Sequence, residues 1–237
     1  MALINVDVKY LDWLAAVYLS QDKVGIQEIR DGFDLHHDNY RKFGLPNRLI
    51  AKKFLFRIIF GGSAFSFAKD IEFRGCKLSI NQWENVIEKF YMKYNGIREY
   101  HKKIIDIATT TGTLSIPTGR CWTFQIYRNK RGDLEWPITT IKNYPVQGLE
   151  ADLMMVARVS LYNRIKHDPS ILLINSVHDS IVLDVPQDKV EWTINIIKKV
   201  FEDVPSNFKK LFKIEFNLPF RGEISVGNDW GNMEEIT

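Results

Sequence analysis

The stretch Val177-His178-Asp179-Ser180 lies between two apolar runs, Ile171-Leu172-Leu173-Ile174 and Ile181-Val182-Leu183. Short runs of branched apolar residues bounded by polar residues indicate the two strands of a hairpin, so Asp179 is expected at the turn. A carboxylate at the end of a hairpin suits Mg²⁺, which takes oxygen ligands and keeps positions for water and phosphate. Because Asp and Ser are also ordinary turn residues, Asp179 alone leaves a purely structural role open.

A second carboxylate follows from the start of the chain. Ala2 to Val8 is predicted to form a buried strand that delivers Asp7 at its end, and Leu11 to Leu19 has the apolar period of a helix. Two aspartates at the ends of neighbouring strands could hold two divalent ions, one activating an attacking hydroxyl and one stabilising a leaving pyrophosphate. The alternative is that Asp7 caps the helix that follows it.

Residues 41–69 contain seven Lys or Arg and no Asp or Glu, so we expect an anion to bind this segment. Asn47 is predicted to be the N-cap of the helix that follows. This helix runs from Arg48 to Phe60 and stops at Gly61-Gly62.

Four residues recur every fourth position along that helix and share one face: Arg48, Lys52, Phe56 and Phe60. Two cations followed by two rings fit a nucleoside triphosphate lengthwise, with the cations on the phosphates and the rings on sugar and base. The alternative is a solvated basic face beside two core phenylalanines.

The composition limits the class of protein. The chain has 237 residues, of which 45% are hydrophobic, enough for a packed core in one large or two small domains. The net charge is only +3, so nucleic-acid binding would depend on where the cations lie. Cys76 and Cys121 are too few for a disulfide framework. No signal peptide or membrane-length apolar run is present, which predicts a soluble, cytoplasmic protein.

Several segments occur in a characteristic order. They are Asp7-Val8-Lys9-Tyr10-Leu11-Asp12, Asp34-Leu35-His36, Arg48-x3-Lys52-x3-Phe56-x3-Phe60-Gly61, Gly119-Arg120, Asn143-Tyr144-Pro145-Val146-Gln147-Gly148 and His178-Asp179-Ser180. Each is short, but their joint order and spacing resemble the C-terminal palm and fingers portion of A-family (polymerase I-like) DNA polymerases. The resemblance covers nearly the whole chain and extends to a split or phage-type polymerase as the source.

The resemblance implies a catalytic and metal-binding role for Asp7 and Asp179, with two Mg²⁺ ions and Mn²⁺ as an alternative. Asp12 stands where the family usually has a sugar-sensing glutamate, and Phe60 stands where tyrosine is more frequent. Ser180 replaces the usual glutamate after the second aspartate. The first two differences predict looser exclusion of ribonucleotides.

The resemblance also implies contacts with the substrates. His36, Arg48, Lys52, Phe56, Phe60 and Asp12 are expected to bind the nucleotide. Five further residues are expected to bind the template-primer: Gly61, Arg120, Asn143, Gln147 and His178. Gln147, near the start of a helix predicted from Val146 to Arg164, could read minor-groove acceptors that all base pairs share.

The implied fold class is α+β, an antiparallel-sheet palm with an inserted helical fingers subdomain. The predicted divisions are palm at 1–33, fingers at 34–110 and palm at 111–237. Within the last part, strands at 113–116 and 122–127 are predicted to form a hairpin. Residues 128–133 are expected to form an exposed turn with solvated charges, 190–201 a helix, and 212–226 closing strands.

The implied function is template-directed DNA synthesis, with primer-template DNA and deoxynucleoside triphosphates as substrates. Lys52 is expected to give a proton to the leaving pyrophosphate. Two alternatives stay open: a single-subunit RNA-polymerase-like enzyme, and a non-catalytic DNA-binding subunit of a split polymerase. Since only six residues precede Asp7, the thumb and exonuclease are expected to be absent, and a second polypeptide is expected to supply the thumb. The setting implied is a bacterial or phage-infected cell.

Overall fold

A computed structural model of the chain describes residues 1–236. The described chain divides into two compact units. The sheet unit comprises Met1–Leu11 and the described residues of Leu149–Thr237, and the helical unit comprises Asp12–Gly148. The helical unit is thus one insertion into the chain of the sheet unit. The predicted palm and fingers boundaries, after residues 33 and 110, differ from these unit boundaries and remain a prediction about subdomains.

The sheet unit contains a five-stranded antiparallel sheet in the order β6-β7-β1-β8-β9. The strands are β1 Ala2–Val8, β6 Leu172–Val177, β7 Ser180–Val185, β8 Gly222–Gly227 and β9 Met233–Ile236. The central strand β1 alternates between buried and half-buried residues, because successive side chains of a strand point to opposite faces. Its buried residues belong to the core, and the opposite face carries Asp7.

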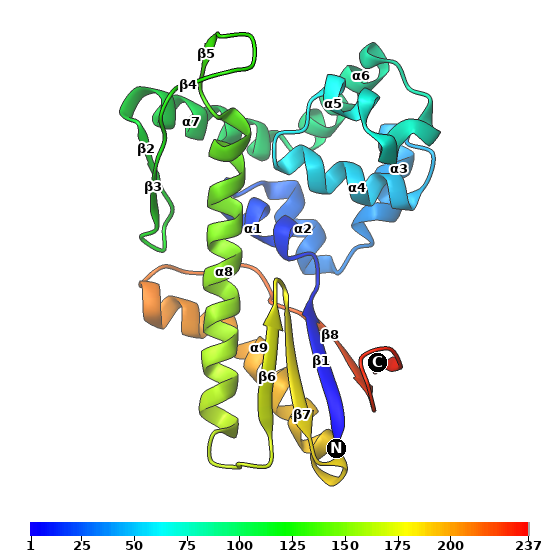
Figure 1. The fold of residues 1–237 in the computed structure, drawn as a ribbon, viewed down its shortest axis with the longest axis vertical. Helices are drawn as coiled ribbons and strands as arrows, with labels where there is room; N and C mark the ends of the chain where they lie inside the picture. The colour runs from blue at the N-terminus through cyan, green and yellow to red at the C-terminus, as the bar shows by residue number, and fades with distance from the viewer. Residues whose placement is uncertain (237) are drawn as a thin grey trace. The chain divides into compact units, whose positions relative to one another are not determined.

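Helix α9, Val190–Phe212, belongs to the same unit and packs its apolar side against the sheet. Its buried positions recur at helical spacing, as expected for one apolar face. In Figure 1 it lies behind β6 and β7. Gly222 of β8 allows a close approach, since a Cβ there would lie 2.3 Å from the ring of Phe201.

The helical unit begins with α1 Leu11–Ser20, α2 Lys23–Asp31, α3 Leu35–Phe43, α4 Arg48–Ile59, α5 Ala64–Lys69 and the 3₁₀ turn η1 Ile71–Cys76. It continues with α6 Ile80–Lys93, α7 Asn95–Thr111 and two hairpins, β2 Thr113–Ser115 with β3 Cys121–Thr123 and β4 Tyr127–Arg128 with β5 Leu134–Glu135. Its core is aromatic: Phe54 stacks on Trp83 at 6.0 Å and Phe67 on Trp83 at 5.0 Å between ring centroids.

Helix α8, Ile138–Ile165, starts eight residues before the predicted Val146. The helix thus runs through Pro145, although proline lacks a backbone donor and usually breaks helices. Ile141, in the turn before the proline, is fully buried in an apolar cluster, and this packing outweighs the lost hydrogen bond. Helix α9 likewise runs through Pro205 to Phe212, past its predicted end at residue 201.

Two strand predictions also need correction. The second strand of the predicted hairpin at 113–127 ends at Thr123, and Tyr127 instead pairs with Glu135 in a separate hairpin. The predicted closing strands from 212 are confined to β8 and β9, which start at Gly222 and Met233. Local alternation does not show which strand partners the tertiary structure offers.

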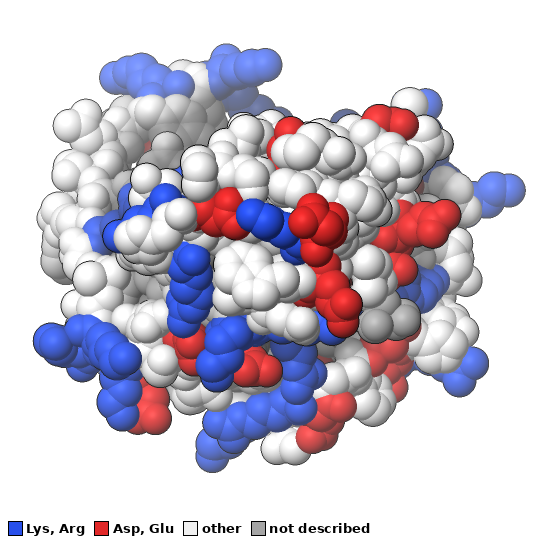
Figure 2. Space-filling view, turned by 90° about the horizontal axis from the view of Figure 1, so that it is seen from below, with Lys and Arg blue, Asp and Glu red and all other residues white. Residues whose placement is uncertain are grey.

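The α+β class is confirmed, with an antiparallel sheet and an inserted helical unit. No helix among residues 1–236 is long and apolar enough to cross a membrane. Figure 2 shows cationic and anionic side chains interspersed on the face that it presents, in keeping with the small net charge.

Candidate active site

The hairpin of β6 and β7 places Asp179 in a two-residue turn. Val177 pairs with Ser180, so His178 and Asp179 alone connect the strands. His178 has a φ of 51°, in the left-handed region that His, Asn and Asp adopt more readily than most residues. Ser180 Oγ donates to the Val177 carbonyl at 3.0 Å and so stabilises the turn. The backbone therefore holds Asp179 at the end of the hairpin.

Asp7 lies on β1 beside this turn. It pairs with Ser180 across the antiparallel ladder, and the Val8 amide donates to the Asp179 carbonyl at 2.9 Å. Directly opposed residues point to the same face of a sheet, so Asp7 and Ser180 share a face. Both aspartates are half-exposed. The structure thus places the backbones of two predicted residues that lie far apart in the sequence next to each other, Asp7 on β1 and Asp179 in the turn before β7.

A third carboxylate near Asp7 was missed by the sequence reasoning. Glu223 of β8 is the partner of Asp7 on the other side of β1. Lys9 Nζ lies 2.8 Å from Glu223 Oε1, and this hydrogen bond raises the pKa of Lys9. No local pattern signals Glu223, because its position depends on the pairing of β1 with β8. The ion pair balances the Glu223 charge beside the aspartates.

Asp7 and Asp179 can be compared with the ligands that the expected Mg²⁺ ions take. Within residues 1–236, no group of three or more His, Cys, Asp or Glu side chains could hold a metal by itself. Mg²⁺ is commonly bound by one or two carboxylates together with water and substrate phosphates, so Asp7 and Asp179 fit such an ion. Ser180 Oγ donates its proton within the turn, and its neutral hydroxyl does not supply the negative charge of the glutamate that it replaces.

In the helical unit, Asp34 connects the starts of α3 and α4. Its carboxylate accepts the His36 and His37 amides at 3.2 and 3.1 Å and so caps α3. It also accepts from Arg48 Nε at 3.1 Å. Partial burial alone would raise the pKa of Asp34, but the hydrogen bonds from Arg48 and the two amides hold it below its usual range. The pairing of Asp34 with Arg48 was also missed, because no sequence spacing predicts it.

We call the set Arg48, Lys52, Phe56 and Phe60 the α4 stripe, and His36 lies beside its two cations. Its side chain is buried, and burial together with the charges of Arg48 and Lys52 lowers its pKa to about 4. The imidazole is therefore neutral near pH 7. A neutral ring beside two cations can donate a hydrogen bond to a phosphate oxygen.

The α4 stripe faces away from the core of the helical unit. Its helix starts as predicted, with the Asn47 side chain accepting the Ile50 amide at 3.0 Å. Apolar residues such as Phe54 and Ile58 bury the opposite side. Phe56 is half-exposed, and its ring packs edge-on against Phe60 at 4.9 Å between centroids. The rings are thus available on the same face as the cations.

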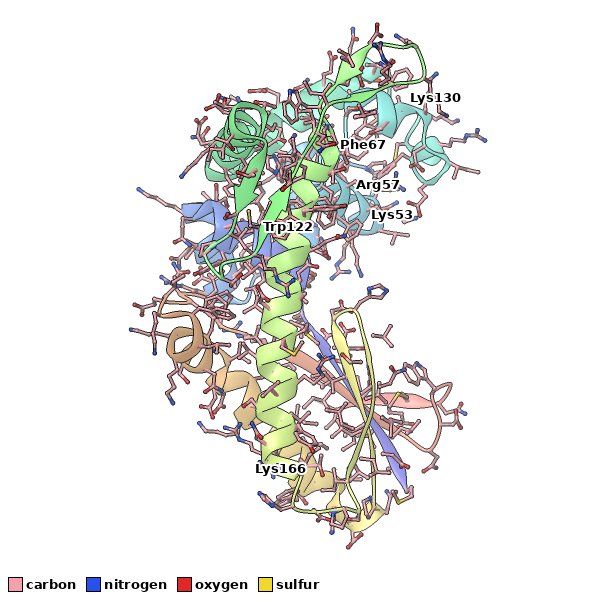
Figure 3. All side chains as sticks on the ribbon, turned by 60° about the vertical axis from the view of Figure 1, so that its left-hand side comes forward. Lys53, Arg57, Phe67, Trp122, Lys130 and Lys166 are labelled. Carbon is pink, nitrogen blue, oxygen red and sulfur yellow. The ribbon has the colours of Figure 1, made fainter. Side chains whose placement is uncertain are left out.

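Ion pairs distinguish Lys52 from the other cations of α4, since Arg48 on the stripe pairs with Asp34. Off the stripe, Lys53 pairs with Glu72 at 3.0 Å, and Arg57 pairs with Asp70 and with Glu72. Figure 3 labels Lys53 and Arg57 on α4. Lys52 has no carboxylate partner in the described chain. An exposed ammonium without a partner is the strongest local candidate for an anionic ligand.

Two predicted residues lie at the ends of helices. Gly61 follows α4 with a φ of 93°, a conformation that favours glycine, and a Cβ there would lie 3.1 Å from Lys142 Cδ, a tight contact. Asp12 is half-buried in the first turn of α1, where a carboxylate is favourable next to the helix N-terminus. Asp12 belongs to the helical unit, and Asp7 belongs to the sheet unit.

Three of the predicted template-primer residues, Arg120, Asn143 and Gln147, lie on or against the first half of α8, whereas His178 lies in the β6–β7 turn. Gly148 lets the β2–β3 hairpin approach, since a Cβ there would lie 2.6 Å from the Trp122 ring and 3.3 Å from Arg120 Cδ. Asn143 and Gln147 are four residues apart and share a face of the helix. The Asn143 Oδ1 atom is buried and accepts no hydrogen bond from the described residues, so a donor from outside the unit can satisfy it.

A family model described as DNA polymerase family A matches residues 1–232. The thermostable DNA polymerase I of Thermus filiformis is 26% identical over 244 residues, which cover 96% of this chain and 27% of that protein. DNA polymerase I of Lactococcus lactis subsp. cremoris is 27% identical, over 96% of this chain and 26% of that protein. The chain spans about a quarter of the length of these relatives.

The fold is similar to a solved structure described as the POL domain of Pol1 from M. smegmatis in complex with DNA primer-template and dNTP. The TM-score is 0.79 at 20% sequence identity, over 97% of this chain and 40% of that one. At this identity the likeness concerns the fold. The family match, in contrast, includes both segments that carry the two aspartates, Asp7 and Asp179. Because it spans nearly the whole sequence, this chain belongs to DNA polymerase family A.

Proposed function

We propose that this chain is the catalytic portion of a template-directed DNA polymerase that joins deoxynucleoside triphosphates to a primer 3′ end. The observation that carries the proposal is the hydrogen bond from the Val8 amide to the Asp179 carbonyl, which sets Asp7 next to the β6–β7 turn at one end of the antiparallel sheet. The family membership and the DNA polymerase I relatives support the reaction class. The primer-template and dNTP named for the similar structure support the substrates.

In the proposed reaction, the primer 3′-hydroxyl oxygen attacks the α-phosphorus of the incoming nucleotide, and the bond to the bridging oxygen breaks to release pyrophosphate. Two divalent ions held by Asp7 and Asp179 would favour the deprotonated hydroxyl and neutralise charge on the phosphates. Arg48 and Lys52 bind the triphosphate, and the neutral His36 donates a hydrogen bond to it. Lys52 protonates the leaving pyrophosphate, because its ammonium pairs with no carboxylate among residues 1–236 and is therefore available to the substrate.

Phe56 and Phe60 are proposed to pack on the sugar and base. The chain positions the reactants and neutralises charge without forming a covalent intermediate, as phosphoryl transfer generally requires. On the DNA side, Arg120 contacts a phosphate, and Asn143 and Gln147 contact the minor groove. Gly61 and His178 lie at the template-primer in the same proposal.

The proposal is tested by primer extension with Mg²⁺ and deoxynucleotides, with and without a second polypeptide that carries a thumb. Asp179→Asn is expected to lower the rate at least about a hundredfold, because the change removes a ligand charge without altering side-chain size. The matched control is Asp184→Asn, which makes the same change further along β7 and should extend the primer normally. Equal rates for Asp179→Asn and the unchanged chain would refute the catalytic role. No extension under either condition would favour the non-catalytic DNA-binding subunit.

Sugar selection separates the DNA polymerase from the RNA-polymerase-like alternative. The unchanged chain is expected to insert deoxyribonucleotides faster than ribonucleotides. Asp12→Ala should lower the ratio of the deoxyribonucleotide rate to the ribonucleotide rate. Faster ribonucleotide insertion by the unchanged chain would favour RNA synthesis. A ratio that Asp12→Ala leaves unaltered would remove Asp12 from sugar recognition.

A further inference from the structure

The β4–β5 hairpin ends in a sharply defined turn, Asn129–Gly132, within a segment expected from the sequence to be a solvated turn. Asn129 Oδ1 accepts the Arg131 amide at 2.8 Å and the Asp133 amide at 3.0 Å. Gly132, with a φ of 88°, donates its amide to the Asn129 carbonyl at 3.0 Å. Lys130 and Arg131 therefore occupy the two central turn positions, where side chains project outward. In Figure 3, Lys130 lies at the outer end of the hairpin.

The charges of this turn are not neutralised within the hairpin. Glu135 accepts from Asn129 Nδ2 at 2.6 Å, and Asp133 lies 3.4 Å from the same nitrogen. Neither Lys130 nor Arg131 forms an ion pair with any residue in the range 1–236. Both acids are thus held by an amide, and the two exposed cations remain available for an external anion.

The base of the hairpin is firmly attached to the template-primer side of the helical unit. Trp122 and Trp136 pack against a buried cluster that includes Leu114, Phe124 and Ile141. Helix α8 starts two residues after Trp136, and the Ile138 amide donates to the Trp136 carbonyl at 2.8 Å. A preorganised turn on a rigid base loses little conformational entropy when it binds.

Exposed apolar side chains accompany the cations. Tyr127 is 48% exposed on β4, and Leu134 on β5 is 65% exposed. Proteins that bind single-stranded nucleic acid combine cations for the backbone with exposed aromatic rings on which bases stack. Bases inside a duplex are already stacked, so an exposed ring favours a single strand.

We propose that the β4–β5 hairpin binds the single-stranded template overhang ahead of the primer end, with Lys130 and Arg131 on its phosphates and Tyr127 on a base. The inference rests on the proposed polymerase function, because that function supplies the template. Along the axis of α8, Ile138 and Gln147 lie about 14 Å apart. The hairpin therefore lies several nucleotides from the minor-groove contact proposed for Gln147.

The test is equilibrium binding of fluorescent DNA by the full chain. One DNA carries a template overhang of about ten nucleotides, and the other is the same duplex with a blunt end. For Lys130→Gln/Arg131→Gln, the overhang DNA should bind about tenfold more weakly, and the slope of log K against log salt should fall by roughly 1.4. Binding of the blunt duplex should be unaltered. Tyr127→Leu should weaken only the overhang DNA and leave the salt slope unchanged.

The control variant is Lys209→Gln/Lys210→Gln, which removes two adjacent exposed cations from α9 and should alter neither DNA. Equal losses for overhang and blunt DNA in the hairpin variant would overturn the inference, as would no loss for either. Primer extension by the unchanged chain is measured in parallel. If the unchanged chain does not extend the primer but the hairpin variant still loses binding only to the overhang DNA, the polymerase proposal is contradicted and the hairpin inference is supported.

Discussion

Lys52 and Lys53 are neighbours in the sequence but occupy different electrostatic settings. Lys53 lies on the side of α4 where Glu72 pairs with it, whereas Lys52 lies on the α4 stripe and influences the pKa of His36. The helical period separates the two side chains by about 100° around the axis. The position of an acid elsewhere in the chain then decides which lysine is available to a substrate.

Lys52→Met is expected to lower the single-turnover rate by about a hundredfold or more, because it removes both a phosphate contact and a proton donor. Lys53→Met is the matched control. It should leave the rate unchanged and lower stability by under about 1 kcal/mol, since exposed ion pairs contribute little. Rapid-quench measurements compare the two variants. A retained rate in Lys52→Met would exclude the proton-donor role.

His101 makes stability depend on pH. Its side chain is buried and bonds to the Tyr91 hydroxyl at 3.0 Å, and burial, followed by the charge of Lys142, lowers its pKa to about 3. Between pH 6.5 and about 3 the unfolded state binds a proton that the folded state does not. The free energy of unfolding therefore falls as the pH falls, by up to about 1.4 kcal/mol per pH unit.

His101→Asn is expected to flatten that slope, as measured by denaturant unfolding from pH 7 to pH 4. The buried His36, whose pKa is also lowered, contributes in the same direction and remains in the variant. The control is His167→Asn, which changes an exposed histidine and should retain the slope. An unaltered slope in His101→Asn would mean that His101 does not carry the effect.

At the scale of elements, α8 connects the two units and carries residues proposed to contact DNA. Its helix tolerates Pro145 because buried residues on both sides, Ile141 and Leu149, fix it in place. The β2–β3 hairpin packs on the same helix through Trp122. The positions of Asn143 and Gln147 therefore depend on packing as much as on helical geometry.

Gly148→Ala is expected to displace the β2–β3 hairpin, because the new Cβ would meet the Trp122 ring at 2.6 Å. Overpacking of this kind costs about 1–3 kcal/mol, and we expect primer-template binding to weaken severalfold as Arg120 moves. Thermal unfolding and DNA titration measure the two effects. Gly75→Ala is the control: a Cβ added there would meet no atom within 4 Å, so neither stability nor DNA binding should change. Unchanged DNA binding in Gly148→Ala would separate this contact from the DNA surface.

At the scale of the whole molecule, a helical unit is inserted between two segments that pair in one sheet. Strand β1 at the start of the chain lies between β7 and β8, which both follow the insertion. The antiparallel ladder between β1 and β7 pairs Asp7 with Ser180 and so brings Asp7 next to the turn that carries Asp179. The stability of this arrangement comes from the apolar core, and the half-exposed aspartates contribute little to it.

Removal of divalent ions by a chelator is therefore expected to stop nucleotide addition without unfolding the chain. The melting temperature should fall by less than about 3 °C, which corresponds to under about 1 kcal/mol for a chain of this size. Extension should return when Mg²⁺ is restored. A large fall in melting temperature would indicate that the ions also stabilise the fold.

The sequence alone determined the features that depend on neighbours within about four residues. The face of α4 that carries Arg48 and Lys52 follows from the helical period, its start follows from the Asn47 cap, and the turn at Asp179 follows from the two apolar runs beside it. The family resemblance was confirmed, and the roles of individual site residues remain predictions.

Only the tertiary structure decided which distant segments pair. The ladder places Glu223 and Lys9 beside Asp7, the packing of α3 on α4 joins Asp34 to Arg48, and buried contacts extend α8 through Pro145. Strand register and side-chain partners depend on free energies summed over residues remote in the chain, whereas sequence patterns report only local preferences. For this reason the separate motifs could be predicted from the sequence, whereas the residues that surround them in space could not.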